Sequence, residues 1–243
     1  MRLLTNKLVI CVLIFANVML FSETPESMIE KNLRARGNID SLQNLKTFRI
    51  VGKIETEGTE FPMVYYYKSP DKYRIQIDLM GQNGITVFNG DEGWLVDPSQ
   101  NIFTPQRLSA MDVASIKPML NCIFSFYSDK LINYESKGIK LDSLYQSAYE
   151  GKKVFNLAFT TPGNHHYTYT IDPNTYLDFV HTVVLGSTNL TFKLKLMEFY
   201  SFNGIVFPRI IESKVDNNQR LTKVIIENIQ VNNPIDDNLF SIP

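Results

Sequence analysis

The sequence predicts a mainly β protein built on one large, meandering antiparallel sheet. Apolar and polar residues alternate in stretches from Thr47 to Val96 and again from Val154 to Val231, which is the pattern of strands that bury one face. Short segments rich in Gly, Asn, Asp and Pro separate these stretches and suit tight turns. We expect about eleven strands, and strands joined by such short reversals lie antiparallel to their neighbours.

Residues 1–22 are expected to form a signal peptide that is not part of the fold. Two basic residues precede an apolar run from Leu8 to Phe21, which is shorter than the roughly 20 apolar residues that a membrane-spanning helix needs. The cleavage site near Ser22 is a mediocre match, so an uncleaved N-terminal anchor remains the alternative. Cleavage there would give a mature chain that begins near Glu23.

The remaining residues, 23–243, are expected to form a single domain. No Gly/Ser-rich or Pro-rich linker divides them, and β domains of roughly 200 to 250 residues are common. Without the signal peptide, 22 basic residues stand against 25 acidic ones. There is therefore no basic excess to suggest a nucleic-acid partner.

Two helical segments are expected before the sheet begins. Thr24 is a good N-cap and Pro25 suits the first helical position, while Gly37 is a good stop. The segment from Glu26 to Arg36 is therefore predicted to be helical. The three-residue spacing that follows predicts a second, short turn of helix, and it is carried by Ile39, Leu42 and Leu45.

Eleven segments carry the strand pattern. The turns at residues 69–71 (SPD) and 89–93 (NGDEG) divide the first group, and the glycines of the second turn allow the positive φ angles of a tight reversal. The strands predicted in the first half are Thr47–Glu55, Met63–Tyr67, Tyr73–Leu79, Ile85–Phe88 and Trp94–Val96. Those predicted in the second half are Val154–Thr160, His166–Asp172, Leu177–Leu185, Leu190–Tyr200, Ile205–Val215 and Leu221–Val231.

The stretch between these halves, from about Gln106 to Tyr134, is predicted to be helical. It has few turn signals, and its apolar residues recur at three- and four-residue spacing. Pro118 is expected to break it into one or two helices. One stripe of this stretch is expected to face the sheet, and it consists of Met119, Leu120, Ile123, Phe124 and Tyr127.

The residues give no sign of catalysis, and we expect neither an enzyme nor a bound metal or cofactor. The chain has no nucleophile elbow, no phosphate-binding glycine loop and no zinc-binding H-E-x-x-H. The adjacent His165 and His166 would point to opposite faces of a strand and so cannot close on one metal ion. Cys122 lies among apolar residues, and we expect it to be a buried hydrophobe and not a nucleophile.

The unusual feature of the sequence is its large number of bulky apolar and aromatic residues. The chain has 16 Phe and 12 Tyr, concentrated on the predicted strands, and almost no charge between Val113 and Phe126. Two interpretations are open. Either the helices pack on the sheet as an ordinary core, or the sheet and the helices leave a pocket between them for an apolar ligand.

Several motifs follow one another in the order found in a known family. Residues 67–74 (YKSPDKYR) are similar to a lysine, any residue, proline, aromatic-Arg pattern, and residues 89–98 (NGDEGWLVDP) to a (D/N)G-x-x-x-W-x-x-(D/N)P segment. Weaker echoes lie at 171–177 (IDPNTYL), 203–208 (NGIVFP) and 234–243 (PIDDNLFSIP). Together they resemble the periplasmic lipoprotein carriers LolA and LolB and their outer-membrane lipoprotein-sorting relatives.

The resemblance implies an unclosed barrel of about eleven antiparallel strands with helices as a lid over an acyl-binding cavity. It implies a monomeric periplasmic carrier of acylated lipoproteins or lipids, with an inner-membrane donor and an outer-membrane acceptor as partners. A ligand-sensing or interaction module that regulates an envelope partner is the alternative on the same fold. The expected lid is the stripe at 119–127. The residues expected to line the cavity are Phe48, Ile50, Met63, Tyr65, Tyr67, Tyr73, Ile75, Ile77 and Trp94.

One departure from the family's pattern lies at Ser69. In the carrier that moves between the two membranes, the residue before the motif proline is an arginine associated with lid closure and ligand release. The neighbouring Lys68 would point to the other face of a strand. The gating mechanism of that carrier is therefore not carried over to this chain.

Overall fold

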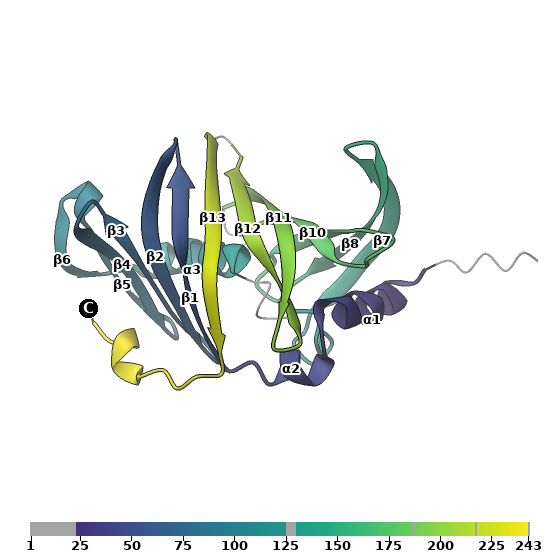
Figure 1. The fold of residues 1–243 in the computed structure, drawn as a ribbon, viewed down its shortest axis with the longest axis horizontal. Helices are drawn as coiled ribbons and strands as arrows, with labels where there is room; N and C mark the ends of the chain where they lie inside the picture. The colour runs from purple at the N-terminus through teal and green to yellow at the C-terminus, as the bar shows by residue number, and fades with distance from the viewer. Residues whose placement is uncertain (1–22, 125–129, 187, 217, 243) are drawn as a thin grey trace, which may run out of the picture.

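The computed structural model describes residues 23–124, 130–186, 188–216 and 218–242. They form one antiparallel sheet of thirteen strands that curves into an unclosed barrel, with few helices (Figure 1). The fold class expected from the sequence is confirmed, although the strand count is two higher than expected. The expected signal peptide, residues 1–22, lies outside the described residues.

The strands fall into two runs that a helix connects. The first run is β1 (Thr47–Thr56), β2 (Thr59–Lys68), β3 (Lys72–Leu79), β4 (Gln82–Asn89), β5 (Glu92–Asp97) and β6 (Ile102–Arg107), with the short helix η1 (Pro98–Gln100) before β6. The second is β7 (Lys140–Tyr149), β8 (Lys152–Thr160), β9 (His166–Ile171), β10 (Asp178–Val184), β11 (Thr191–Phe202), β12 (Ile205–Val215) and β13 (Asn218–Val231). Helix α3 (Ala110–Ile123) follows β6 and precedes β7.

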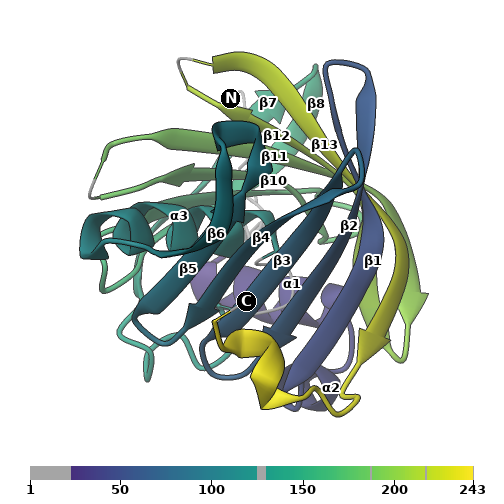
Figure 2. The same cartoon turned by 90° about the vertical axis from the view of Figure 1, so that its left-hand side faces the viewer.

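The two runs join at the middle of the sheet, where β1 pairs with β13. From that pair the strands follow in order to β6 at one edge and to β7 at the other. Helix α3 links the two edge strands in sequence and crosses the inner side of the curved sheet (Figures 1 and 2). The open barrel is therefore bridged by a helix and not closed by a strand.

Edge strands β6 and β7 are the two that the sequence does not predict. β6 contains Pro105, which lacks the N–H of a ladder bond and is tolerated in a sheet mainly at an edge. β7 is largely exposed along its length, so it lacks the alternation that burial of one face imposes on a sequence. Burial patterns reveal strands with covered faces and say little about strands at an edge.

Helix α3 is shorter than the predicted helical stretch and is not broken at Pro118. Proline removes one backbone hydrogen bond from a helix interior, but Val113 and Leu120 on either side of it are buried against the sheet. This packing maintains the helix through the proline. The start of the predicted stretch, Gln106, belongs to β6, and residues 130–138 form turns.

The chain enters the sheet through two helices, as expected. Helix α1 (Pro25–Arg36) begins at Thr24, whose Oγ1 accepts a hydrogen bond from the Ser27 N–H at 3.2 Å, and α2 (Ile39–Gln43) follows. Gly37 ends α1 with a φ of 140°. A side chain there would collide with the Gly204 carbonyl oxygen, so only glycine allows α1 to lie this close to the β11–β12 turn.

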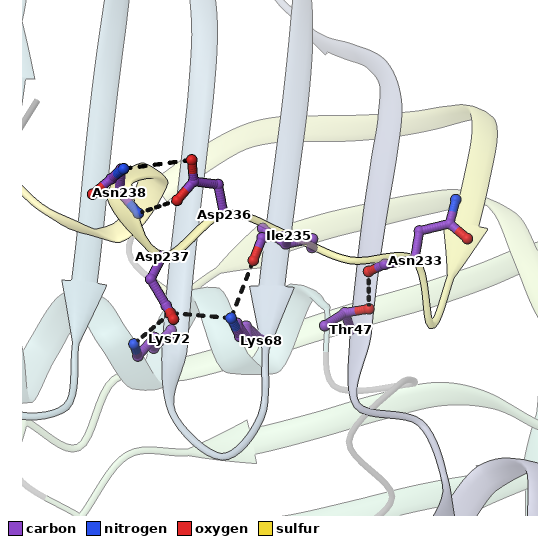
Figure 3. A network of polar contacts seen from close by, with 8 residues as sticks. All are labelled: Thr47, Lys68, Lys72, Asn233, Ile235, Asp236, Asp237 and Asn238. Carbon is purple, nitrogen blue, oxygen red and sulfur yellow. Dashed lines mark hydrogen bonds and ion pairs between the residues drawn. The ribbon is translucent and has the colours of Figure 1, made fainter.

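The C-terminal segment lies across the outer face of β1–β4 (Figures 2 and 3). The Thr47 hydroxyl donates to the Asn233 carbonyl at 2.6 Å, and Lys68 Nζ donates to the Ile235 carbonyl at 3.1 Å. The Asp237 carboxylate then bridges Lys68 and Lys72 at 3.1 and 2.7 Å. The segment ends in η2 (Asp237–Phe240). These contacts attach the end of the chain to the side of the sheet opposite α3.

Candidate ligand-binding site

The strand register gathers aromatic side chains on the concave face of the first half-sheet. Residues directly opposite each other in antiparallel neighbours project from the same face. Phe48 pairs with Tyr67, Tyr67 with Tyr73, and Tyr73 with Phe88. The rings of Phe48 and Tyr67 stack at 4.7 Å between centroids, and those of Tyr67 and Tyr73 lie 5.3 Å apart. A row of four aromatic residues therefore crosses four neighbouring strands.

The next row continues this apolar surface. Ile50 pairs with Tyr65, and Tyr65 with Ile75. Burial raises the pKa of Tyr65 and of Tyr73, so both remain neutral phenols at physiological pH. Eight of the nine expected cavity residues project from this face, and all are buried except Ile77, which is half-buried against the same core. They are Phe48, Ile50, Met63, Tyr65, Tyr67, Tyr73, Ile75 and Ile77.

The expected place of Trp94 in the cavity is wrong. In the register of β4 and β5, Gly93 pairs with Phe88 while Trp94 pairs with Val87. Because side chains alternate along a strand, Val87 and Trp94 project from the face opposite to Phe88. Motif position alone places Trp94 on a strand, but only the register decides which face it occupies.

The second half-sheet contributes an equivalent aromatic surface that the list of expected residues omitted. The rings of Phe159 and Tyr167 stack at 5.1 Å, and Tyr169 meets Phe159 edge-on at 5.0 Å. All three are at most 3% exposed. One signal was present, since Tyr167, Tyr169 and Ile171 alternate strictly with polar residues in the predicted strand His166–Asp172. The concave face is therefore aromatic on both sides of the β1–β13 junction.

Helix α3 and the residue after it occupy the space in front of this face. The ring of Phe124 stacks on that of Tyr65, with centroids 3.9 Å apart and planes 14° apart. Leu120 and Phe124 are buried, and Met119 and Ile123 are half-buried against the core. Tyr127, the last residue of the expected lid, lies outside the described residues. Any ligand on the concave face beneath α3 must therefore take the place of these side chains.

A polar contact fixes α3 to two turns of the sheet. Lys117 Nζ lies 2.6 Å from Asp71 Oδ2 in the β2–β3 turn and 2.7 Å from the Gly90 carbonyl in the β4–β5 turn. The Lys117 side chain is 14% exposed. Both partners belong to turns and not to strands, so breaking this contact leaves the sheet ladder intact.

A pocket of about 510 Å³ opens at the end of the barrel near the β2–β3 turn. Leu42 and Leu45 approach it from the α2 segment, and Ile132 and Ile139 from the segment before β7. Tyr67 of the aromatic row forms part of its wall. Its remaining lining residues are Gln43, Lys46, Ser69, Pro70, Lys130, Asn133 and Lys137. Tyr67 is therefore shared by this pocket and the aromatic row.

A buried polar cluster attaches α1 to β10 in the second half-sheet. Asp178 Oδ1 accepts a hydrogen bond from Asn32 Nδ2 at 2.8 Å and lies 3.7 Å from Arg36 Nε, while Oδ2 contacts His181 Nε2. The His181 ring stacks on Tyr169 at 3.9 Å. Burial alone would raise the pKa of Asp178, but Arg36 and the hydrogen bonds hold it below its ordinary value. Burial lowers the pKa of His181.

The arrangement of this cluster suits attachment and not catalysis. Asp178 and His181 form an acid–base pair of the kind found in active sites, yet they are 2% and 1% exposed. Substrate and water would have to displace α1 to reach them. In the residues that the structure describes, no group of three His, Cys, Asp or Glu side chains is placed to hold a metal ion.

Within the same described residues, no helix has the length and apolar character required to cross a bilayer.

No protein-family model and no curated protein matches the sequence. Solved structures match the fold. A LolA superfamily protein from Nitrosomonas europaea has a TM-score of 0.58 at 13% identity, over 90% of this chain and 98% of its own. A DUF1329 family protein from Desulfovibrio piger has a TM-score of 0.56 at 13% identity, over 90% and 98% of the two chains. A domain assigned as an outer membrane lipoprotein-sorting protein, from Vibrio parahaemolyticus, has 0.56 at 11% identity, over 89% and 97%.

The chain therefore has a LolA-like fold over nearly its whole described length. At identities of 11 to 13% the structural likeness establishes a shared fold. It therefore confirms, for the fold, the resemblance found in the sequence motifs.

Proposed function

We propose that this protein is a non-catalytic carrier that binds the acyl chains of lipoproteins or lipids on the concave face of its sheet. The observation that supports this proposal most is that α3 and Phe124 lie over the concave face. An aromatic surface spanning both half-sheets faces α3, a helix that no strand ladder holds, and the residue that follows this helix, Phe124, stacks on Tyr65. Such a cover can leave without unfolding the sheet.

The energetics suit reversible loading. An acyl chain gains about 0.8 kcal/mol for each methylene removed from water. Entry of the chain displaces Leu120 of α3 and Phe124, which follows the helix, so part of that gain replaces contacts that are lost. A carrier needs this balance, because a ligand that gained the full burial energy would not be released.

Location and partners follow from this function. Residues 1–22 direct export to the periplasm of a bacterium with an outer membrane, and residues 23–243 act as one monomeric domain. An inner-membrane donor loads the carrier and an outer-membrane acceptor unloads it.

Native mass spectrometry of protein purified from the periplasm, followed by lipid extraction, tests the proposal. We expect adducts whose extracted mass matches acylated material, and we expect the stripped protein to rebind a palmitoylated peptide. The same peptide without its acyl chain serves as the control and should not bind. Protein that is isolated empty and ignores the palmitoylated peptide would refute the carrier function.

The emission of Trp94 should change little when an acyl ligand binds, because its side chain projects from the outer face. Trp94 is the only tryptophan in the chain, so the spectrum is easily assigned. A Tyr67→Trp variant made in a Trp94→Phe background places the reporter on the concave face and should respond strongly. Fluorescence titration of both proteins, alongside calorimetry, checks this. A large response from Trp94 with a silent Tyr67→Trp variant would put the ligand on the outer face.

A further inference from the structure

The C-terminal segment, residues 233–242, is attached to the outer face through side chains of the sheet and not through a strand ladder (Figure 3). Its carbonyl oxygens accept hydrogen bonds from Thr47 of β1, Lys68 of β2 and Arg74 of β3, at 2.6, 3.1 and 3.2 Å. Among the described residues, none after Asn232 forms a backbone–backbone hydrogen bond with a strand. The segment can therefore leave the sheet while every ladder stays intact.

Two lysines of the outer face hold the acidic side chain of this segment. Lys68 and Lys72 pair directly across β2 and β3, and their ammonium groups lie 3.1 and 2.7 Å from the Asp237 carboxylate. Hydrogen bonds from Lys72 and Lys68 lower the pKa of Asp237, so the carboxylate is ionised at neutral pH. An extended peptide with an acidic residue at this point is thus recognised by two positive charges.

Phe240 is the apolar anchor of the segment. It is completely buried in η2, which contacts β3 and β4. Val87 of β4 projects from the outer face and is also completely buried. The surface formed by Thr47, Lys68, Lys72, Arg74 and Val87 is called the outer-face groove. It recognises backbone carbonyls, one carboxylate, and one aromatic ring three residues after that carboxylate.

The C-terminal segment leaves part of the outer-face groove unused. Arg74 Nε is buried and has no hydrogen-bond partner among the described residues, which is costly for a charged group. A cavity of about 110 Å³ lies between the segment and the sheet, with Arg49 and Tyr66 on the sheet side and Pro234 and Leu239 on the segment side. Both observations indicate a surface that another peptide can fill more completely.

We infer that the outer-face groove binds an extended, acidic segment of a partner protein, and that the C-terminal segment occupies the groove until this partner displaces it. Charge selects the occupant, since Lys68, Lys72 and Arg74 attract a carboxylate and repel a basic peptide. A tethered segment competes at a high effective concentration, so the partner must offer additional contacts, such as an acceptor for Arg74. The inference does not depend on the carrier function, because the groove lies on the side of the sheet opposite α3.

Binding of a labelled peptide to the mature protein, followed by fluorescence anisotropy, tests the inference. The peptide has the sequence of residues 232–243, NNPIDDNLFSIP. The recipient is a Phe240→Ala variant, which loses the apolar anchor of its own segment and keeps the groove. We expect it to bind the peptide about tenfold more tightly than wild type, whose groove is filled by the tethered segment.

A second recipient protects the test against misfolding of the first. Asp237→Ala changes only a side chain that is 61% exposed, so this protein should fold normally. Loss of two solvent-screened ion pairs weakens the tethered segment less, and the gain in peptide affinity should be about threefold. If Phe240→Ala does not fold, Asp237→Ala carries the same comparison.

Control peptides and groove variants show what is recognised. One control peptide has alanine in place of Asp237 and Phe240, the other has lysine in place of Asp236 and Asp237, and neither should bind. Lys72→Glu, made in the Phe240→Ala protein, reverses one charge of the groove and should lower peptide affinity about tenfold. The matched control is Lys214→Glu, at an exposed position of β12 in the other half-sheet, and it should leave the affinity unchanged.

The outcomes decide between occupants. Equal binding of the peptide by wild type and the folded recipients, or by Lys72→Glu and Lys214→Glu, overturns the groove. Binding of the lysine-substituted peptide as tightly as the native one overturns the acidic partner. Analytical ultracentrifugation of wild type should show a monomer, and a dimer that the peptide dissociates would identify a second copy of this chain as the occupant and overturn the partner protein.

Discussion

Replacing Phe124 with alanine is expected to lower the free energy of unfolding by about 3 kcal/mol and to raise the apparent affinity for an acyl ligand roughly tenfold. The first effect follows from loss of a ring that is 3% exposed and stacked on Tyr65. The second follows because Phe124 occupies the position that the ligand needs. When the competent state is a minor one, apparent affinity falls in proportion to its population. We expect about half of the lost free energy, roughly 1.4 kcal/mol, to be specific to the closed state, which gives a factor of about ten.

Two further variants identify the cause of this gain. Lys117→Gln removes the contact of α3 with Asp71 and the Gly90 carbonyl, so it should also raise affinity, at a smaller stability loss of about 1 to 2 kcal/mol. Tyr65→Ala removes the other ring of the stack from the sheet itself and should lower both stability and affinity. Denaturant midpoints and acyl-ligand titrations on all three proteins check this. If Phe124→Ala weakens binding as Tyr65→Ala does, α3 belongs to the bound site and does not compete with the ligand.

Asp178→Ala is expected to lower the free energy of unfolding by about 3 to 5 kcal/mol. Removing one member of a buried ion pair leaves the other charge buried without it, and Arg36 is 4% exposed. Asn32 and His181 lose their carboxylate contacts in the same change. Urea denaturation at pH 7, where Asp178 is ionised, measures the loss.

Asp237→Ala is the matched comparison. The Asp237 carboxylate also joins two elements, but it does so on the outer face, with a side chain that is 61% exposed. Solvent screens such a pair, so the stability loss should be much smaller than at Asp178. Adding Arg36→Met to Asp178→Ala removes the buried guanidinium and should restore part of the stability. Equal losses at Asp178 and Asp237, or no recovery with Arg36→Met, would show that burial of the cluster is not what stabilises α1.

The strands with one buried face were the part of the fold that the sequence could predict. The Thr24 cap, the Gly37 stop and the eleven central segments each depend on local chemistry or on alternation, and both can be read from neighbouring residues. Strands β6 and β7 could not be found in this way. Both lie at edges, where exposure removes the alternation and where Pro105 breaks no ladder bond.

The sequence predicted most residues of the candidate site, but it did not predict how all of them are arranged in space. Alternation placed Phe48, Tyr65 and Tyr73 on one face because each belongs to a regular strand. Trp94 was misplaced because its face depends on how β5 is aligned with β4, and no property of a single strand gives that register. The pocket at the barrel end joins three segments that are distant in sequence. Its lysines therefore had no pattern by which they could be grouped.

The pairing of β1 with β13 has a consequence for the order in which the molecule assembles. Each half-sheet consists of neighbours in sequence, so its hairpins can form early and locally. Joining them requires Phe48 to meet Val231 and Thr56 to meet Thr222, which closes a loop of most of the chain at a large entropic cost. Until the last strand arrives, β1 presents an unpaired edge that invites wrong partners. A chain that stops before residue 218 can build β1–β6 and β7–β12 but lacks β13, the strand that unites them.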